Sequence, residues 1–169
     1  AAIVTAREAL MRAALFALAL AAAGPAQAQT AIGFEGLRQD PDAPVEVASN
    51  ALTVEQAQGR AVFTGNVVVT QGALRLAAGT VTVDYAPGGA GIRRIEAAGG
   101  VTFATATDAA EAREATYEVT TGALTMTGDV VLTQGPATIT GDRLVADLRA
   151  GTGRIEGRVR TVFRPAAAD

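Results

Sequence analysis

The chain contains no histidine, no cysteine, no tryptophan and no lysine among its 169 residues. Without histidine and cysteine it has no Ser-His or Cys-His nucleophile pair, no imidazole or thiolate metal ligand, and no side chain that usually acts as a general base near neutral pH. We therefore expect a protein that is not an enzyme and that uses neither a metal ion nor a cofactor. Because no disulfide can form, strand pairing and apolar burial must supply the stability.

Charge is also scarce. The chain carries 14 basic and 17 acidic side chains, which give a net charge of −3, and all the basic ones are arginines. The arginines occur singly or in small groups. Binding to a phosphate backbone requires a dense positively charged face, so we expect no nucleic-acid partner.

The beginning of the chain has the pattern of a leader. An apolar run of Ala, Leu and Phe over 13–23 follows a basic residue, Pro25 interrupts it, and 26–28 has the small-x-small pattern that a signal peptidase cleaves. The run is too short for a membrane span, which needs ~20 apolar residues. We expect 1–28 to be upstream residues plus a cleavable signal peptide, which predicts a periplasmic protein. An uncleaved anchoring helix is the alternative.

Three further segments follow this leader. Residues 29–44 are rich in Gly, Pro and Asp without apolar periodicity, which indicates a flexible N-terminal arm. Residues 45–165 alternate apolar and polar side chains, and 166–169 form a short tail. The length of the alternating segment suits one domain.

The stretch from Phe63 to Asp84 carries the clearest alternation. Apolar residues stand two apart in three consecutive segments, and Gly72 and Gly79 are expected at the turns between them. Successive side chains of a strand point to opposite faces, so this spacing predicts short antiparallel strands with one apolar face.

The pattern then recurs along the chain. The segments TGNVVVTQG and TGDVVLTQG, which begin at Thr64 and Thr127, are nearly identical. A glycine stands two residues before a valine four times, at intervals of about 30 residues: Gly65, Gly99, Gly128 and Gly157. The sequence therefore predicts an all-β fold built from repeated hairpin units.

Carboxylates are the remaining candidates for chemistry. Asp84, Glu118 and Asp147 hold equivalent positions in three repeats, and paired carboxylates can hydrolyse glycosides. Their recurrence instead favours a structural role at strand ends. The acidic run at 108–114 could offer oxygen ligands to calcium, but it lacks the glycine-bearing loop of such sites, which favours a solvated surface.

Small aliphatic side chains dominate the repeats, while the whole chain has only two tyrosines and five phenylalanines. An apolar wall of this kind offers dispersion contacts to alkyl chains without polar demands. The same residues can instead pack on one another as an ordinary sandwich core. Periodicity alone does not separate these two possibilities.

The order of the motifs resembles one family. ASN at 48–50 opens the predicted sheet, FTGNVVVTQG follows at 63–72, and a strand with two spaced valines follows at 78–83. This order resembles the LptA (OstA-like) family of periplasmic lipopolysaccharide-transport proteins, and the resemblance covers 45–165. It implies an open, twisted antiparallel β-jellyroll with an apolar groove that binds the acyl chains of lipid A.

The resemblance also implies partners. Members of the family join end to end with an inner-membrane partner, LptC, and an outer-membrane partner, LptD, so that lipopolysaccharide crosses the periplasm along a bridge. A head-to-tail homo-oligomer is a further possibility. The alternative is an exported structural scaffold of β-repeats without a lipid cavity.

The predicted groove is lined by the apolar residues that alternate along each strand. Each acyl methylene that the groove removes from water would contribute ~0.8 kcal/mol to lipid binding. Arg60, Arg75 or Arg143 could meet lipid phosphate at its mouth. The predicted groove residues are Val45, Val47, Leu52, Val54, Phe63, Val67, Val69, Leu74, Leu76, Val81, Val83, Val101, Phe103, Tyr117, Leu124, Met126, Val130, Leu132, Ile139 and Leu144.

Both ends of the sheet should be open. Val45 and Val47 at one end, and Val159, Thr161 and Phe163 at the other, are the expected assembly edges. Unpaired edge strands can add a strand from a neighbouring domain.

Overall fold

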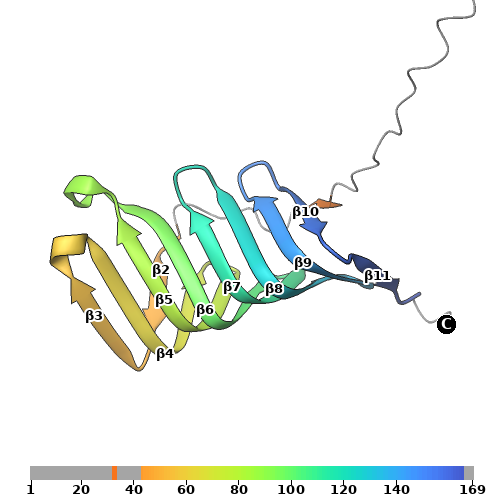
Figure 1. Cartoon of the computed structure of the whole chain (residues 1–169), viewed down its shortest axis with the longest axis horizontal. Coiled ribbons are helices and arrows are strands. Elements are labelled where there is room, and N and C mark those ends of the chain that lie inside the picture. The colour runs from red at the N-terminus through yellow and green to blue at the C-terminus, as the bar shows by residue number, and fades with distance from the viewer. Residues whose placement is uncertain (1–31, 34–42, 166–169) are drawn as a thin grey trace, which may run out of the picture. The chain divides into compact units, whose positions relative to one another are not determined.

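The computed structural model describes residues 32–33 and 43–165, which form one antiparallel β-sheet (Figure 1). The predicted signal peptide, most of the predicted arm and the tail lie outside these residues. The strands are β1 (Ile32–Gly33), β2 (Val45–Ala48), β3 (Ala51–Glu55), β4 (Arg60–Gln71), β5 (Leu74–Tyr85), β6 (Ile92–Ala104), β7 (Asp108–Glu118), β8 (Ala123–Gln134), β9 (Ala137–Asp147), β10 (Thr152–Glu156) and β11 (Arg160–Phe163). Two single turns of 3-10 helix, Gln56–Gln58 and Pro87–Gly89, follow β3 and β5.

The sheet is an up-and-down meander. Each strand from β4 to β9 pairs antiparallel with the next strand along the chain. The first and last positions of the sheet are each filled by two short strands, because β2 and β3 both pair with β4, while β10 and β11 both pair with β9. The predicted all-β fold, an open antiparallel β-jellyroll built from hairpins, is confirmed.

The strands are longer than the sequence predicts, because one predicted turn is wrong. Gly72 lies in the turn between β4 and β5, but Gly79 lies inside β5, which runs unbroken from Leu74 to Tyr85. A glycine stands there because two backbones come close. A Cβ atom at Gly79 would lie 3.2 Å from the carbonyl oxygen of Gly99, and one at Gly99 would lie 3.2 Å from the Cα of Gly79.

A line of irregular backbone crosses β4 to β9 and passes through the breaks between β2 and β3 and between β10 and β11, and we call it the crease. In β4, β6 and β8 the pairing shifts by one residue at the crease, where two residues face one on the following strand. Both residues of each pair have positive φ, for example 86° and 49° at Gly128 and Asp129. Such bulges bend a strand and increase its twist. The crease runs through Ser49-Asn50, Gly65-Asn66, Gly79, Gly99-Gly100, Arg113, Gly128-Asp129, Asp142 and Gly157-Arg158.

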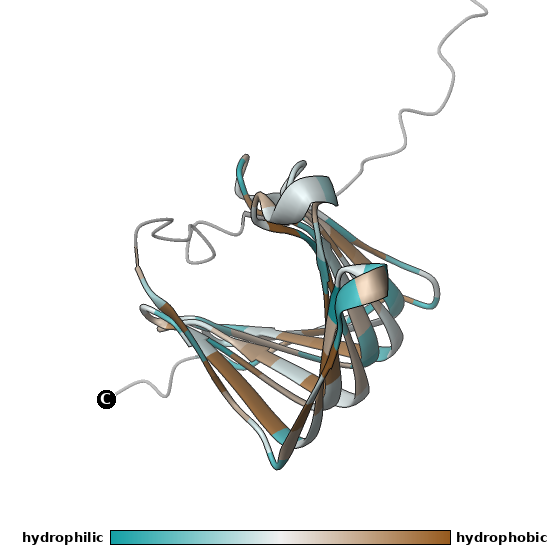
Figure 2. Cartoon of the chain, turned by 90° about the vertical axis from the view of Figure 1, so that its left-hand side faces the viewer, coloured by the Kyte–Doolittle hydropathy of each residue, from teal (hydrophilic) through white to brown (hydrophobic). Residues whose placement is uncertain are grey.

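The crease folds the sheet over its own apolar face. Figure 2 looks at the sheet from the β3 end and shows its two halves diverging from the crease. A side chain on a single sheet is hidden from water only when something covers it, and the other half of the same sheet provides this cover. Seven side chains are less than 2% exposed for this reason: Met126, Leu132, Leu144, Val67, Val81, Val101 and Val130.

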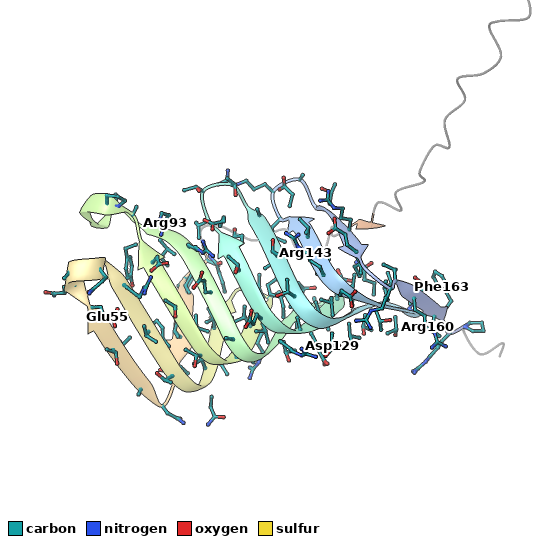
Figure 3. The ribbon with its side chains drawn as sticks, viewed as in Figure 1. Glu55, Arg93, Asp129, Arg143, Arg160 and Phe163 are labelled. Carbon is teal, nitrogen blue, oxygen red and sulfur yellow. The ribbon has the colours of Figure 1, made fainter. Side chains whose placement is uncertain are left out.

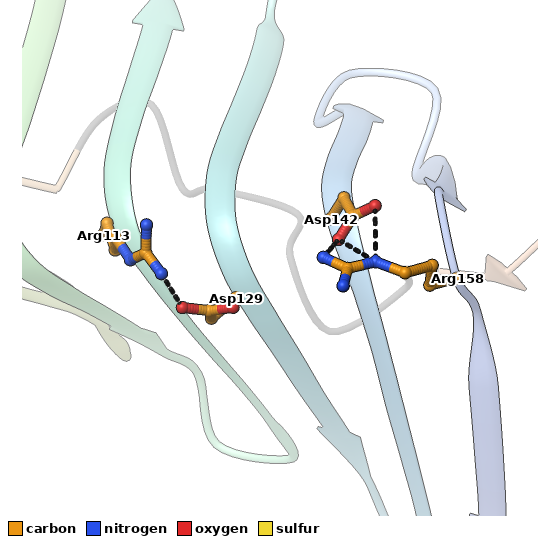
Figure 4. Close-up of polar contacts among 4 residues, drawn as sticks. All are labelled: Arg113, Asp129, Asp142 and Arg158. Carbon is orange, nitrogen blue, oxygen red and sulfur yellow. Dashed lines mark hydrogen bonds and ion pairs between the residues drawn. The ribbon is translucent and has the colours of Figure 1, made fainter.

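Ion pairs hold the outer side of the crease (Figure 4). Arg113 on β7 bonds to Asp129 on β8, and Arg158, between β10 and β11, bonds to Asp142 on β9 with an Nη2–Oδ1 distance of 2.6 Å. The hydrogen bond from Arg158 lowers the pKa of Asp142 below its ordinary value of 3.8. Each pair joins a bulge residue to the strand before it, so side chains reinforce the crease where the backbone ladder is interrupted.

The geometry of the crease predicts that substitution by alanine destabilises the fold by different amounts at two neighbouring glycines. Gly99 and Gly100 have φ of 81° and 80°, so alanine at either position carries a similar backbone cost, about 1–2 kcal/mol. Only Gly99 also faces another backbone, whereas a Cβ at Gly100 meets nothing within 4 Å. Urea unfolding should therefore find Gly99→Ala clearly less stable than Gly100→Ala. Equal stabilities would contradict the close approach.

The Asp142–Arg158 ion pair predicts that the stability of the fold depends on pH. Because the folded-state pKa of Asp142 is lowered, the unfolded chain takes up this proton first as the pH falls through 3.8. The contribution of the pair is therefore complete at neutral pH and is lost in acid. Asp142→Asn should be less stable than the unaltered protein at pH 7, and the difference should shrink toward pH 3. A difference that does not change with pH would refute this.

Candidate functional site

The candidate site is the apolar face that the crease folds inward. Residues directly opposite each other on neighbouring strands share a face, so the pairing register assigns every strand residue to one side. One row of paired residues crosses the sheet through Leu52, Phe63, Val81, Ala97, Ala115, Met126, Leu144 and Ile155. On the other side of the crease, a second row runs through Val47, Val69, Leu76, Phe103, Ala110, Leu132, Ile139 and Thr161.

A third row lies further from the crease, beside the first. It passes through Val54, Ala61, Val83, Ile95, Tyr117, Leu124, Ala146 and Gly153. Beside the crease itself, Val67 pairs with Ala78 and Val101 pairs with Ala112. Val45 and Leu74 both stand opposite Gln71, and Val130 stands opposite Gly141. With these pairs, the rows place the predicted groove residues on one face.

Burial divides this face into two zones. The seven side chains that are less than 2% exposed form a packed floor along the crease. A further set of large apolar residues is only partly buried and packs against the buried residues, and we call this set the wall. The wall consists of Val47, Phe63, Val69, Leu74, Leu76, Ile92, Ile95, Tyr117, Ile139 and Ile155.

The wall includes residues that sequence reasoning left out of the groove. Ile92, Ile95 and Ile155 belong to it, and buried alanines such as Ala97 and Ala110 lie between the larger side chains. The alanines were missed because alanine is too common in this chain to mark a face. The repeat spacing was the signal that could have found them, because it aligns each alanine with a larger residue of another repeat.

Tyr117 is the aromatic residue of the wall on β7. Its Cα stands opposite Ile95 on one side and Leu124 on the other. Burial raises the pKa of its phenol above 10.0, because the ionised form would lie beside apolar neighbours. The phenol is therefore neutral at physiological pH, and the wall carries no charge at this position.

The arginines expected at the groove mouth lie on the other face. Arg60, Arg75 and Arg143 alternate with apolar-face neighbours in β4, β5 and β9, so they stand on the convex side. Arg60 also donates from Nε to Asp84 Oδ1 at 2.8 Å, and this hydrogen bond raises the pKa of its guanidinium. These three side chains therefore do not line the apolar wall, and their contact with lipid phosphate at the groove mouth stays a prediction.

The recurring carboxylates have structural partners. Asp84 bonds to Arg60, and Glu118 lies 3.3 Å from Arg94. Asp147 Oδ1 accepts two backbone N–H groups of the turn that follows β9, both at 2.9 Å. They stand at the ends of β5, β7 and β9, which is the structural role predicted from their recurrence.

A separate cavity of about 840 Å³ lies between the β3–β4 turn and the β5–β6 loop. It is lined mainly by 56–60 and 85–89, with Val54 and Arg93. Arg60 and Arg93 both reach Asp84 here, at 2.8 and 3.7 Å, so their charge is partly neutralised. The cavity shares Val54 with the third apolar row, and its other lining residues lie outside the rows.

The apolar face is open at both ends of the sheet. At the first edge Val45, Leu52 and Val54 are exposed, and at the last edge Val159 and Phe163 are exposed, Phe163 to 72%. Figure 3 labels Glu55 at the first edge and Arg160 and Phe163 at the last. The predicted assembly edges Val45, Val47, Thr161 and Phe163 lie on β2 and β11, while Val159 immediately precedes β11.

Neither a metal cluster nor a membrane-spanning helix is found in the part of the chain that the structure describes. Within 32–33 and 43–165, no three His, Cys, Asp or Glu side chains are grouped so that they could hold a metal ion. No helix in the same residues is long and apolar enough to cross a membrane.

Known proteins resemble both the sequence and the fold. Residues 46–152 match the family described as "LptA/(LptD N-terminal domain) LPS transport protein". An uncharacterized protein of Rhizobium meliloti (strain 1021) is 32% identical over 168 residues, which cover 93% of this chain and 90% of that protein. The crystal structure of LptH, titled the LptA-homologous periplasmic component of the lipopolysaccharide-transport device of Pseudomonas aeruginosa, superimposes with a TM-score of 0.67 at 22% identity. The superposition covers 75% of this chain and 99% of LptH.

This is a family of lipopolysaccharide (LPS) transport proteins and not of enzymes. The match covers most of the creased sheet and both halves of its apolar face. The chain therefore belongs to the LptA/LptD N-terminal domain family of LPS-transport proteins.

Proposed function

We propose that this protein carries LPS through the periplasm by holding the acyl chains of lipid A against the wall of its apolar face. The observation that carries the proposal is the continuity of the apolar rows, which run through β4 to β9 and end on exposed edge strands on both sides. A closed cavity would hold a lipid, whereas an open row also lets it pass along.

The burial pattern supports the wall, rather than the floor, as the lipid contact. The floor residues are already out of water, so a lipid gains little by touching them. The wall residues are half-buried and have surface left to cover. Each acyl methylene that they remove from water contributes about 0.8 kcal/mol, and many similar contacts give binding without one deep site.

Transport also requires continuity from one domain to the next. We propose that the open edges join end to end with the related domains of LptC and LptD, or with further copies of this chain. The exposed apolar side chains at both edges support this, since Leu52 and Phe163 would be covered in such a joint. Edge-strand addition supplies backbone hydrogen bonds for it.

A second candidate is a structural scaffold without bound lipid, and the packed floor favours it. The floor is hidden from water with no ligand present, as in an ordinary sandwich core. The two candidates differ in what touches the wall.

Photo-crosslinking from neighbouring positions on β4 separates them. Val69 pairs with Val47 and Leu76 on the apolar face, whereas Val68 pairs with Ala48 and Ala77 on the other face. Both side chains are partly exposed, so each is a control for the other. A photoreactive residue at Val69 should form adducts with LPS, and one at Val68 should not.

The other outcomes each overturn the lipid proposal. Adducts only at Val68 would mean that the convex face carries the lipid. The absence of adducts at both positions, in protein shown to be folded, would leave the scaffold.

A further inference from the structure

The two edges of the sheet have matching shapes. At the first edge, a five-residue strand (β3) and a four-residue strand (β2) are separated by Ser49 and Asn50. At the last edge, a five-residue strand (β10) and a four-residue strand (β11) are separated by 157–159. Both breaks fall on the crease, with β3 and β10 on one side of it and β2 and β11 on the other.

The repeats show how two such edges would pair. Within the sheet, each strand that carries a bulge pairs with the next strand in one register: Thr64 opposite Thr80, Ala98 opposite Glu114, and Thr127 opposite Arg143. On the other side of the bulge, Val67, Val101 and Val130 stand opposite Ala78, Ala112 and Gly141. In the last repeat, Glu156 holds the position of Thr64, and Val159 holds the position of Val67. Continuing the same register would place Glu156 opposite Ala51 of the next copy and Val159 opposite Ser49 of the next copy.

We propose that β10 and β11 of one copy pair with β3 and β2 of the next copy in this internal register, and that β1 competes for the same edge. The inference rests on the proposed end-to-end assembly and specifies its joint. Ile155 then stands opposite Leu52 of the next copy, and Thr161 stands opposite Val47 of the next copy. Strand directions agree, because all neighbours in the sheet are antiparallel and this pairing continues the alternation.

The register makes the apolar rows continuous across the joint. The first row ends at Ile155 and would begin again at Leu52 of the next copy. Leu52 is 54% exposed in the single chain, so the joint covers apolar surface that is otherwise in water. A slip of one residue would instead turn the apolar side chains of the second strand to the convex face.

Charge favours the joining of unlike edges over like edges. Residues 45–55 carry two acidic and no basic side chains, Glu46 and Glu55, whereas 152–165 carry four arginines and one glutamate. In the proposed register, Glu46 of the next copy stands opposite Val162, so Arg160 and Arg164 are its diagonal neighbours. Opposite charges at such positions stabilise strand pairs, and like charges destabilise them. Joining unlike edges is also the geometry that extends into an open assembly.

In the single chain, β1 already occupies part of this edge. Ile32 stands opposite Gly153 and Gly33 opposite Thr152. In the proposed joint, Gly153 and Thr152 instead stand opposite Val54 and Glu55 of the next copy. Because β1 contributes only two paired residues while β3 contributes five, the next copy displaces β1 and pairs more extensively. In this proposal β1 therefore protects the exposed edge of a free copy and weakens self-association.

Disulfide trapping in the full chain tests the register, since the chain has no native cysteine. The double variant Leu52→Cys with Ile155→Cys should give a ladder of covalent oligomers on oxidation. The two positions stand at opposite ends of one sheet and therefore cannot react within a single chain. Matched controls combine Leu52→Cys with Arg154→Cys, which faces the other side, or with Gly153→Cys, which corresponds to a slip of two residues. Both controls should give little ladder.

A disulfide that locks the arm tests the competition. In the variant Ile32→Cys with Gly153→Cys, oxidation at low protein concentration should fix β1 on β10. Sedimentation should then find self-association at least about tenfold weaker than in the same variant after reduction, which serves as its own control. Equal association of the oxidised and reduced forms would overturn the role of β1.

The outcomes separate this inference from the proposed function. A strong ladder from the Gly153→Cys control, with none from Ile155→Cys, would overturn the register and leave end-to-end assembly standing. No ladder from any pair would overturn the joint between copies and leave the related domains of LptC and LptD as the proposed partners of the two edges. Lipid contact is measured independently by crosslinking at Val69.

Discussion

A single sheet with one apolar face must hide that face from water, and every other feature of this fold depends on how it does so. No second sheet or helix covers the apolar rows in the described part of the chain. Instead, a bulge with two successive positive φ angles recurs in β4, β6 and β8, and a matching break separates β10 from β11. Aligned across the sheet, these sites bend it into two halves that cover each other. Each sequence repeat therefore contributes one bulge to the crease.

The crease also decides what the apolar face can do. Close to it, the two halves touch and form a dry floor, which gives the protein its stability without a ligand. Further away the halves diverge, and the side chains of the wall keep part of their surface free. One apolar face thus serves as a core along its centre and, in the proposed function, as a binding surface toward its margins. This arrangement suits a family that transports an amphipathic lipid, because stability does not depend on the cargo.

Much of this arrangement could be predicted from the sequence, because period-2 alternation and a repeat of about 30 residues are local signals. They identified the all-β fold, the hairpins and the apolar phase of each strand, as the placement of Val69 and Leu76 on one face illustrates. They could not predict that Gly79 lies inside a strand, since a turn and a close backbone contact both favour glycine. They also could not divide floor from wall. Met126 and Ile139 look alike in the pattern, and only the folding of the sheet buries the first more deeply than the second.

The position of the arginines was equally hidden from the pattern. Alternation places Arg60, Arg75 and Arg143 out of phase with the apolar residues, but it does not say that the opposite phase is the far side of a folded sheet. The structure supplies that information through the crease. Charge near a bound lipid must therefore come from the rims of the sheet or from its ends, where the loops and edge strands lie.

The repeat unit of two antiparallel strands has a consequence for how such proteins can change in length. Inserting or deleting one whole hairpin keeps the direction of every strand and leaves both edges as they are. Inserting or deleting a single strand would reverse the direction of one edge strand relative to the other. It would also break the alternation between strands that carry a bulge and strands that do not. The apolar face can therefore grow or shrink only in steps of one hairpin. Members of the family with longer or shorter sheets should differ by even numbers of strands.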